Sequence, residues 1–76
     1  MEANIDTGML LAEGQAKILK SNDGHQSVKV KIIDLTFVYL GSCQVRILKP
    51  VGPGKPNGFK PGMILNVRVD DLVDRL

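Results

Sequence analysis

The 76-residue chain is 43% hydrophobic with a formal net charge of +2, which indicates one small globular domain and excludes wholesale disorder. No apolar run approaches the roughly 20 residues that cross a bilayer, and the first residues lack the pattern of a secretory signal. One cysteine cannot form an intramolecular disulfide. We therefore expect a cytoplasmic protein without membrane contact, whose small aliphatic core favours a homo-oligomer.

The charge is distributed unevenly along the chain. Residues 1–16 sum to −3, residues 17–68 to +7 and residues 69–76 to −2. The basic middle is where an anionic partner would bind. The alternative is that these lysines protect exposed strand faces and edges from aggregation.

We expect residues 1–8 to be a flexible lead-in and residues 9–76 to form a single domain. Alternating polarity over Met9–Lys20 favours a strand over an amphipathic helix, with Ala16 and Ile18 on its inward face and Lys17 on the other. Asn22-Asp23-Gly24 follows, and Asp-Gly supplies the positive φ angles of a type I′ hairpin turn. The chain should therefore fold back at this point.

The second strand is the clearest one in the sequence. Val28, Val30 and Ile32 alternate with Lys29 and Lys31, which is typical of a half-buried strand. The apolar character continues to Leu40, too far for one flat strand, so we expect a bend or bulge near Asp34. Gly41-Ser42 then predicts a two-residue type II′ turn into a third, antiparallel strand from Cys43 to Leu48.

Residues 49–62 hold all four prolines and four of the eight glycines. Because proline lacks a backbone donor and glycine is conformationally free, we expect a loop with no central strand. A fourth strand follows, with Met63, Leu65, Val67 and Val69 facing inward. The tail predicts one helical turn capped by Asp70 or Asp71, with inward residues Leu72, Val73 and Leu76.

Three meandering strands, a loop, a fourth strand and a terminal turn predict a mainly β fold. We expect a small antiparallel β-barrel or rolled sheet of the SH3-like kind. An OB-like barrel is less favoured, because the Pro/Gly loop stands where that fold has a helix. This fold shape is shared by many functions and does not choose among them.

The residues that could carry chemistry predict no enzyme. Cys43 and His25 fall at opposite ends of a long strand, so they cannot act as a nucleophile and base. One cysteine and one histidine cannot build a zinc site, and the C-terminal aspartates are better explained as a cap and a solvated face. We therefore expect no catalytic residue, no metal site and no cofactor.

Two binding functions remain open. The favoured one is a protein-interaction module, an adaptor, subunit or inhibitor that presents the loop and a strand edge to a partner through Lys55, Phe59 and Lys60. The alternative is a small barrel that binds single-stranded nucleic acid, with rings stacking on bases and cations on phosphates. Its candidate residues are Lys29, Lys31, Arg46, Arg68, Phe37 and Tyr39.

The placement of the two rings depends on the second strand. If it keeps one register, Phe37 and Tyr39 share a face with Lys29 and Lys31. If a bulge occurs at Asp34, the rings turn into the core, and we favour this second arrangement because aromatic residues in small cores usually pack. Phe59 is either a plug on the barrel end or an exposed contact, and we expect the contact.

Overall fold

The computed structural model describes residues 2–4, 10–21 and 23–75. Within them the elements are β1 (Glu2–Asn4), β2 (Leu10–Ala12), β3 (Ala16–Leu19), β4 (Ser27–Asp34), the 3₁₀ turn η1 (Val38–Leu40), β5 (Ser42–Val51), β6 (Ile64–Arg68), the 3₁₀ turn η2 (Val69–Asp71) and β7 (Leu72–Val73). No helix in these residues is long and apolar enough to cross a membrane.

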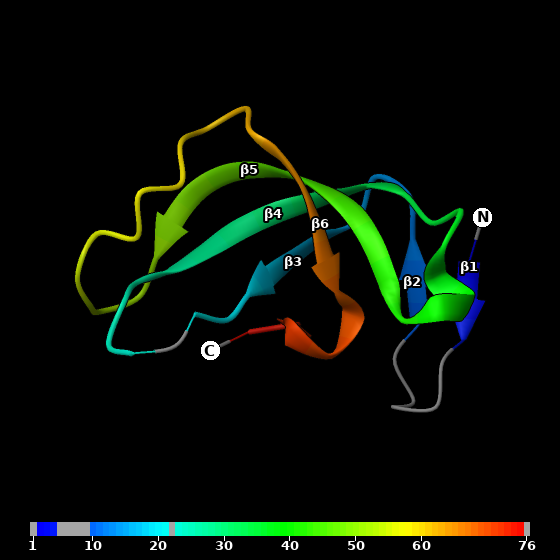
Figure 1. Cartoon of the computed structure of the whole chain (residues 1–76), viewed down its shortest axis with the longest axis horizontal. Coiled ribbons are helices and arrows are strands. Elements are labelled where there is room, and N and C mark those ends of the chain that lie inside the picture. The colour runs from blue at the N-terminus through cyan, green and yellow to red at the C-terminus, as the bar shows by residue number, and fades with distance from the viewer. Residues whose placement is uncertain (1, 5–9, 22, 76) are drawn as a thin grey trace.

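Five strands form one antiparallel sheet in the order β6-β5-β4-β3-β7, and β1 and β2 form a separate pair. Figure 1 shows β4 and β5 arching over β3 and the C-terminal segment, so the sheet is strongly curled into a half-barrel. The predicted antiparallel β fold is confirmed. The segment expected to be a flexible lead-in includes a paired strand, since Glu2 lies opposite Ala12. Residues 1 and 5–8 lie outside the described residues.

The core fills the concave side of the curled sheet. Strand alternation on β4 and β5 sends every second side chain inward, as the sequence predicts. The predicted inward residues of these strands are fully buried or nearly so. Buried apolar residues are Leu11, Leu19, Val28, Val30, Ile32, Leu35, Cys43, Val45, Ile47, Val69 and Leu72.

The first hairpin forms where the sequence predicts it. Asp23 and Gly24 have φ of 62° and 76°, and β3 pairs with β4 so that Leu19 lies opposite Val28. Asn22 lies outside the described residues. The positive φ values are those that the Asp-Gly turn requires.

The strand expected over Met9–Lys20 is two strands, β2 and β3. Gly14, at φ 86°, breaks it with a turn that hydrogen-bonds to Ile32 of β4. The turn reverses the predicted faces of β3, so Lys17 is buried and Ala16 is exposed. A one-residue slip inverts every side chain of a strand, which is why this correction affects all of β3.

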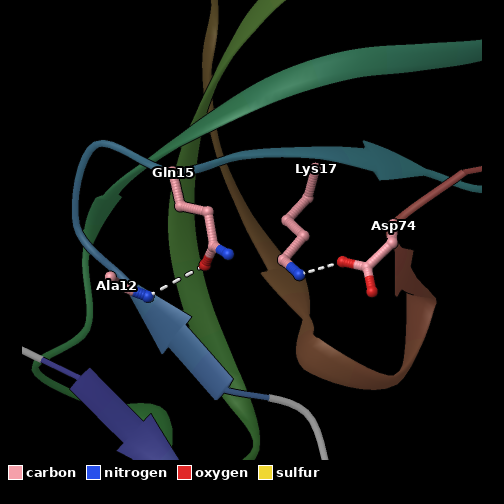
Figure 2. Close-up of polar contacts among 4 residues, drawn as sticks. All are labelled: Ala12, Gln15, Lys17 and Asp74. Atoms are coloured by element: carbon pink, nitrogen blue, oxygen red, sulfur yellow. Dashed lines mark hydrogen bonds and ion pairs between the residues drawn. The ribbon is translucent and has the colours of Figure 1, made fainter.

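Figure 2 shows how the buried Lys17 is accommodated. Its ammonium group donates to the carboxylate of Asp74 and forms an ion pair that ties β3 to the C-terminal segment. Beside it, the Gln15 side-chain oxygen accepts a hydrogen bond of 3.1 Å from the Ala12 backbone N–H and closes the turn between β2 and β3.

The connection from β4 to β5 differs from the predicted two-residue turn. The register shifts between Ile32 and Asp34, which confirms the bulge, and β4 ends at Asp34. The Asp34 carboxylate accepts hydrogen bonds from the Thr36 N–H and hydroxyl, at 2.7 and 2.5 Å, which turns the chain out of the sheet. The turn η1 follows and ends at Gly41, whose φ of 85° is left-handed.

Strand β5 is longer than expected. It runs to Val51, so Lys49 and Pro50 belong to a strand that pairs with β4 and not to the loop. The sequence prediction was wrong here because proline excludes only a strand that needs its missing N–H. The pairing of β5 with β6 ends at Arg46, opposite Ile64. At Pro50, β4 is therefore the only strand among the described residues that pairs with β5.

The C-terminal segment is a 3₁₀ turn followed by a short strand. Leu65 and Val67 face inward on β6 but stay half-buried, Met63 is exposed, and Val69 is buried in η2. The predicted helical turn over 71–76 does not form, because Leu72 and Val73 make up β7. The 3₁₀ turn η2 precedes them, and it has no aspartate cap, since its cap residue is Arg68 and makes no capping side-chain bond. Leu72 is buried in β7, as expected for an inward residue, and Val73 is half-buried. Leu76 lies outside the described residues.

Candidate nucleic-acid interface

Four cations occupy the convex face of the half-barrel. Because Val28, Val30 and Ile32 point inward, the residues between them on β4 point outward. On β5, Arg46 points outward by the same alternation, and the register shift between Lys29 and Val30 brings Lys49 onto the same face. We call this set the basic face, and it consists of Lys29, Lys31, Arg46 and Lys49.

The strand register places these cations directly opposite one another. Lys29 lies across from Lys49, and Lys31 lies across from Arg46. Like charges in this position destabilise a sheet. The two strands are also central in the sheet, so protection of an exposed edge does not explain the lysines.

No acidic partner neutralises the basic face among the residues that the structure describes. The ion pairs recorded there join Lys17 to Asp74 and Arg68 to Asp70. Asp74 also borders a shallow hollow with Lys29 and Lys49, but its carboxylate is bound by Lys17. The basic face therefore carries four positive charges, with Lys31, Arg46 and Lys49 exposed and Lys29 half-buried.

Two exposed rings follow the end of β4, with Phe37 directly before η1 and Tyr39 within it. Phe37 is 57% exposed and Tyr39 is 75% exposed, and their ring centroids lie 6.5 Å apart at an interplanar angle of 42°. The expectation that both rings enter the core is thus wrong, although Leu35 is buried as the bulge predicts. The physical reason is that β4 ends at Asp34, so strand alternation no longer controls the residues of η1.

A hollow of about 300 Å³ lies beside Phe37, at the end of β4. It is lined by Asp34, Phe37, Ser42, Cys43, Gln44 and Asn66. The hydrogen bonds from Thr36 hold the pKa of the Asp34 carboxyl below its usual range, so this group is ionised at neutral pH. The hollow thus places polar groups beside an exposed ring.

The Pro/Gly loop is fastened to the first hairpin. The Lys55 N–H donates to the Gly24 carbonyl at 2.9 Å, and the Lys55 carbonyl accepts from the Gln26 N–H at 2.7 Å. Gly54 permits this contact, because at its φ of 129° a Cβ would meet the Gly24 carbonyl oxygen at 2.7 Å. The loop is therefore a built part of the fold, which its composition alone did not indicate.

The loop residues proposed as contacts divide into two kinds. Lys55 and Lys60 are exposed, whereas Phe59 is half-buried and packs against the core beside Leu65 and Val67. The sequence left two arrangements for Phe59, a plug on the end of the barrel or an exposed contact, and its position here is that of the plug. Its ring also lines a groove of about 510 Å³ between β6 and the end of β3.

The free edge of β6 borders this groove. Ile47 exchanges backbone hydrogen bonds with Gly62 and Met63. Because hydrogen-bonded residues alternate along an antiparallel strand, Leu65 and Val67 are the residues of β6 whose backbone groups bond to β5. The backbone groups of Ile64, Asn66 and Arg68 therefore point away from β5, where no described strand pairs with them. Arg68 itself points outward from this edge strand and lies 3.7 Å from Asp70, apart from the four cations of the basic face.

Two further kinds of group that could carry chemistry are the single cysteine and clusters of metal-ligating side chains. Cys43 is buried, and burial raises the pKa of its thiol, so it behaves as a small apolar residue. No group of three or more His, Cys, Asp or Glu side chains among these residues is placed to hold a metal ion.

The sequence anticipated Lys29, Lys31 and Arg46, which the structure brings together. It missed Lys49, because the prolines beside it assigned that residue to the loop. The signal that could have found it is the three-residue spacing from Arg46 to Lys49. Regular alternation places these two residues on opposite faces, whereas a single bulge in β5 places them on the same face.

In comparisons with known proteins, no family model matches this chain. No curated protein and no solved structure matches it either.

Proposed function

We propose that this domain binds single-stranded nucleic acid on the convex face of its sheet and catalyses no reaction. The observation that carries the proposal is the cross-strand pairing of cations on the central strands, where Lys29 lies opposite Lys49 and Lys31 lies opposite Arg46. Such pairs weaken the sheet by themselves. An anionic strand lying over both pairs would remove this repulsion.

The exposed rings favour a single strand over a duplex. Phe37 and Tyr39 lie at the end of the same sheet as the basic face, and unpaired bases can stack on such rings. A duplex keeps its bases stacked inside, so it would engage only the cations. We further propose that the half-barrel is SH3-like, supported by the meander β3 to β6 and by the 3₁₀ turn that leads to β7 beside β3.

The experiment measures fluorescence anisotropy of labelled single-stranded RNA and DNA between about 0.05 and 0.2 M salt. The test variant Lys31→Gln/Arg46→Gln should weaken binding and flatten the log–log salt dependence by roughly 0.7 for each lost phosphate contact. It should also leave the fold intact, because it removes a like-charge pair.

The matched control is Lys55→Gln/Lys60→Gln, which removes the same charge from the loop. This control should change the salt dependence much less than the test variant. If the control abolishes binding and the test variant does not, the loop is the binding surface and the proposal fails. Absence of binding to every oligonucleotide at low salt would also reject it.

A second candidate function is the protein-interaction module that presents the loop and a strand edge. The specific observation in its favour is the free edge of β6 beside the apolar groove, with Met63 and Ile64 exposed next to it. An extended segment of a partner could pair with such an edge. The anisotropy series separates the two functions, because strand pairing needs no oligonucleotide and has little salt dependence.

A further inference from the structure

The hollow beside Phe37 lies at the end of the basic face. Asp34 and Gln44 are cross-strand partners on β4 and β5, one step beyond the Lys31–Arg46 pair along the sheet. Arg46 and Gln44 are two residues apart on β5, which is roughly 7 Å. A nucleic-acid strand that passes over the four cations therefore reaches this hollow directly.

The charge changes sign along this path. Lys29, Lys49, Lys31 and Arg46 suit phosphates, whereas the Asp34 carboxylate repels them. The uncharged edge of a base is the part of a nucleotide that tolerates a carboxylate, and it gains from one where it offers N–H donors. The hollow is thus the place where a base, and not a phosphate, should lie.

The lining offers the groups that a base needs. The exposed ring of Phe37 forms one wall, and Gln44 and Asn66 each bring an amide with donors and an acceptor. Neither amide hydrogen-bonds to another side chain in the part of the chain that the structure describes. A volume of about 300 Å³ is at the small end for ligand sites and suits one planar group.

Asp34 sets the preference among bases. Thr36 occupies its Oδ1 atom with two hydrogen bonds, and Oδ2 has no recorded partner among the described residues. An ionised carboxylate only accepts hydrogen bonds. It therefore favours the amino group of cytosine over the carbonyl oxygen that uracil carries at the same ring position.

We propose that this hollow binds one unstacked base through Phe37, Gln44 and Asn66, and that Asp34 selects a base with an exocyclic amino group. This inference rests on the proposed function, because the basic face must first bring the strand to the sheet. It adds a base preference that the four cations cannot provide, since phosphate contacts carry no sequence information.

The experiment compares oligo-C and oligo-U RNA of about eight nucleotides by anisotropy at one low salt concentration. These two ligands share the backbone and the ring size. The intact domain should bind oligo-C about five- to tenfold more tightly. Asp34→Asn, which keeps an oxygen for Thr36, should bring the ratio close to one without changing the salt dependence.

Phe37→Ala should weaken both ligands by roughly five- to a hundredfold and preserve their ratio, because stacking is tolerant of base identity. Leu40→Ala is its matched control, since Leu40 is an exposed apolar residue of η1 that does not line the hollow. Circular dichroism of each variant checks that it is folded.

Equal affinities for the two ligands, or a preference for oligo-C that survives Asp34→Asn, would overturn the base pocket and leave the basic face standing. Loss of affinity in Leu40→Ala equal to that in Phe37→Ala would also overturn it. If neither ligand binds the intact domain, the proposed function itself fails, which distinguishes the two failures.

Discussion

The ion pair between Lys17 and Asp74 gives the sharpest test of the fold. Lys17 lies opposite Val30 on the concave side with its side chain 4% exposed, whereas the Asp74 side chain is 76% exposed. A buried ammonium group without a partner costs several kcal/mol, and breaking fully buried pairs costs about 3–5 kcal/mol. Water can reach Asp74 and replace part of its effect, so we expect Asp74→Asn to cost about 1–2 kcal/mol.

A double-mutant cycle isolates the pair. Lys17→Met removes the buried charge and keeps the volume, so its free energy of unfolding should stay close to that of the parent. In that background Asp74→Asn should cost close to nothing, which gives a coupling energy of about 1–2 kcal/mol. The assay is urea unfolding followed by circular dichroism, with each variant measured at low and high salt.

The control is Asp70→Asn, which removes the acid of the exposed Arg68–Asp70 pair. Exposed pairs contribute little, so this change should cost less than about 0.5 kcal/mol. The reasoning would be refuted if Asp74→Asn had the same effect with and without Lys17, or if Asp70→Asn were as costly as Asp74→Asn. Either result would mean that Lys17 is not buried against the core.

Two further predictions follow from single contacts. Phe59→Ala should lower the free energy of unfolding by about 1–2 kcal/mol. This is less than the roughly 3–5 kcal/mol of a fully buried ring, because Phe59 is half-buried. Thermal melts measure this loss against the exposed control Lys60→Ala, and an unchanged melting temperature would show that the ring is not a plug. Thr36→Val should raise the pKa of Asp34 toward its ordinary value, because the hydroxyl bond is lost. Since the folded-state pKa of Asp34 is depressed, its stabilisation is present above the unfolded-state pKa and is lost as pH falls through the folded-state value. The variant should therefore begin to lose this contribution at a higher pH than the parent. An NMR titration measures the pKa of Asp34 in both proteins, and an unchanged pKa would contradict the role of Thr36.

The sequence by itself determined the strands with strong alternation and the first hairpin. Val28, Val30 and Ile32 share a face because the strand period is two, and Asp23-Gly24 turns the chain because few other residues take positive φ. Three of the four cations of the basic face follow from the same alternation. These features depend on residues close in the chain, so local rules suffice.

The tertiary structure alone decided the features that depend on register and on distant contacts. Lys17 is buried because the turn at Gly14 shifts β3 by one position and because Asp74, far along the chain, supplies a counter-charge. Lys49 joins the basic face only through a bulge in β5, and Phe37 and Tyr39 are exposed only because Thr36 ends β4 at Asp34. The placements of Lys17 and Lys49 each depend on a shift of one residue, which inverts a strand while leaving the composition and periodicity of the sequence unchanged.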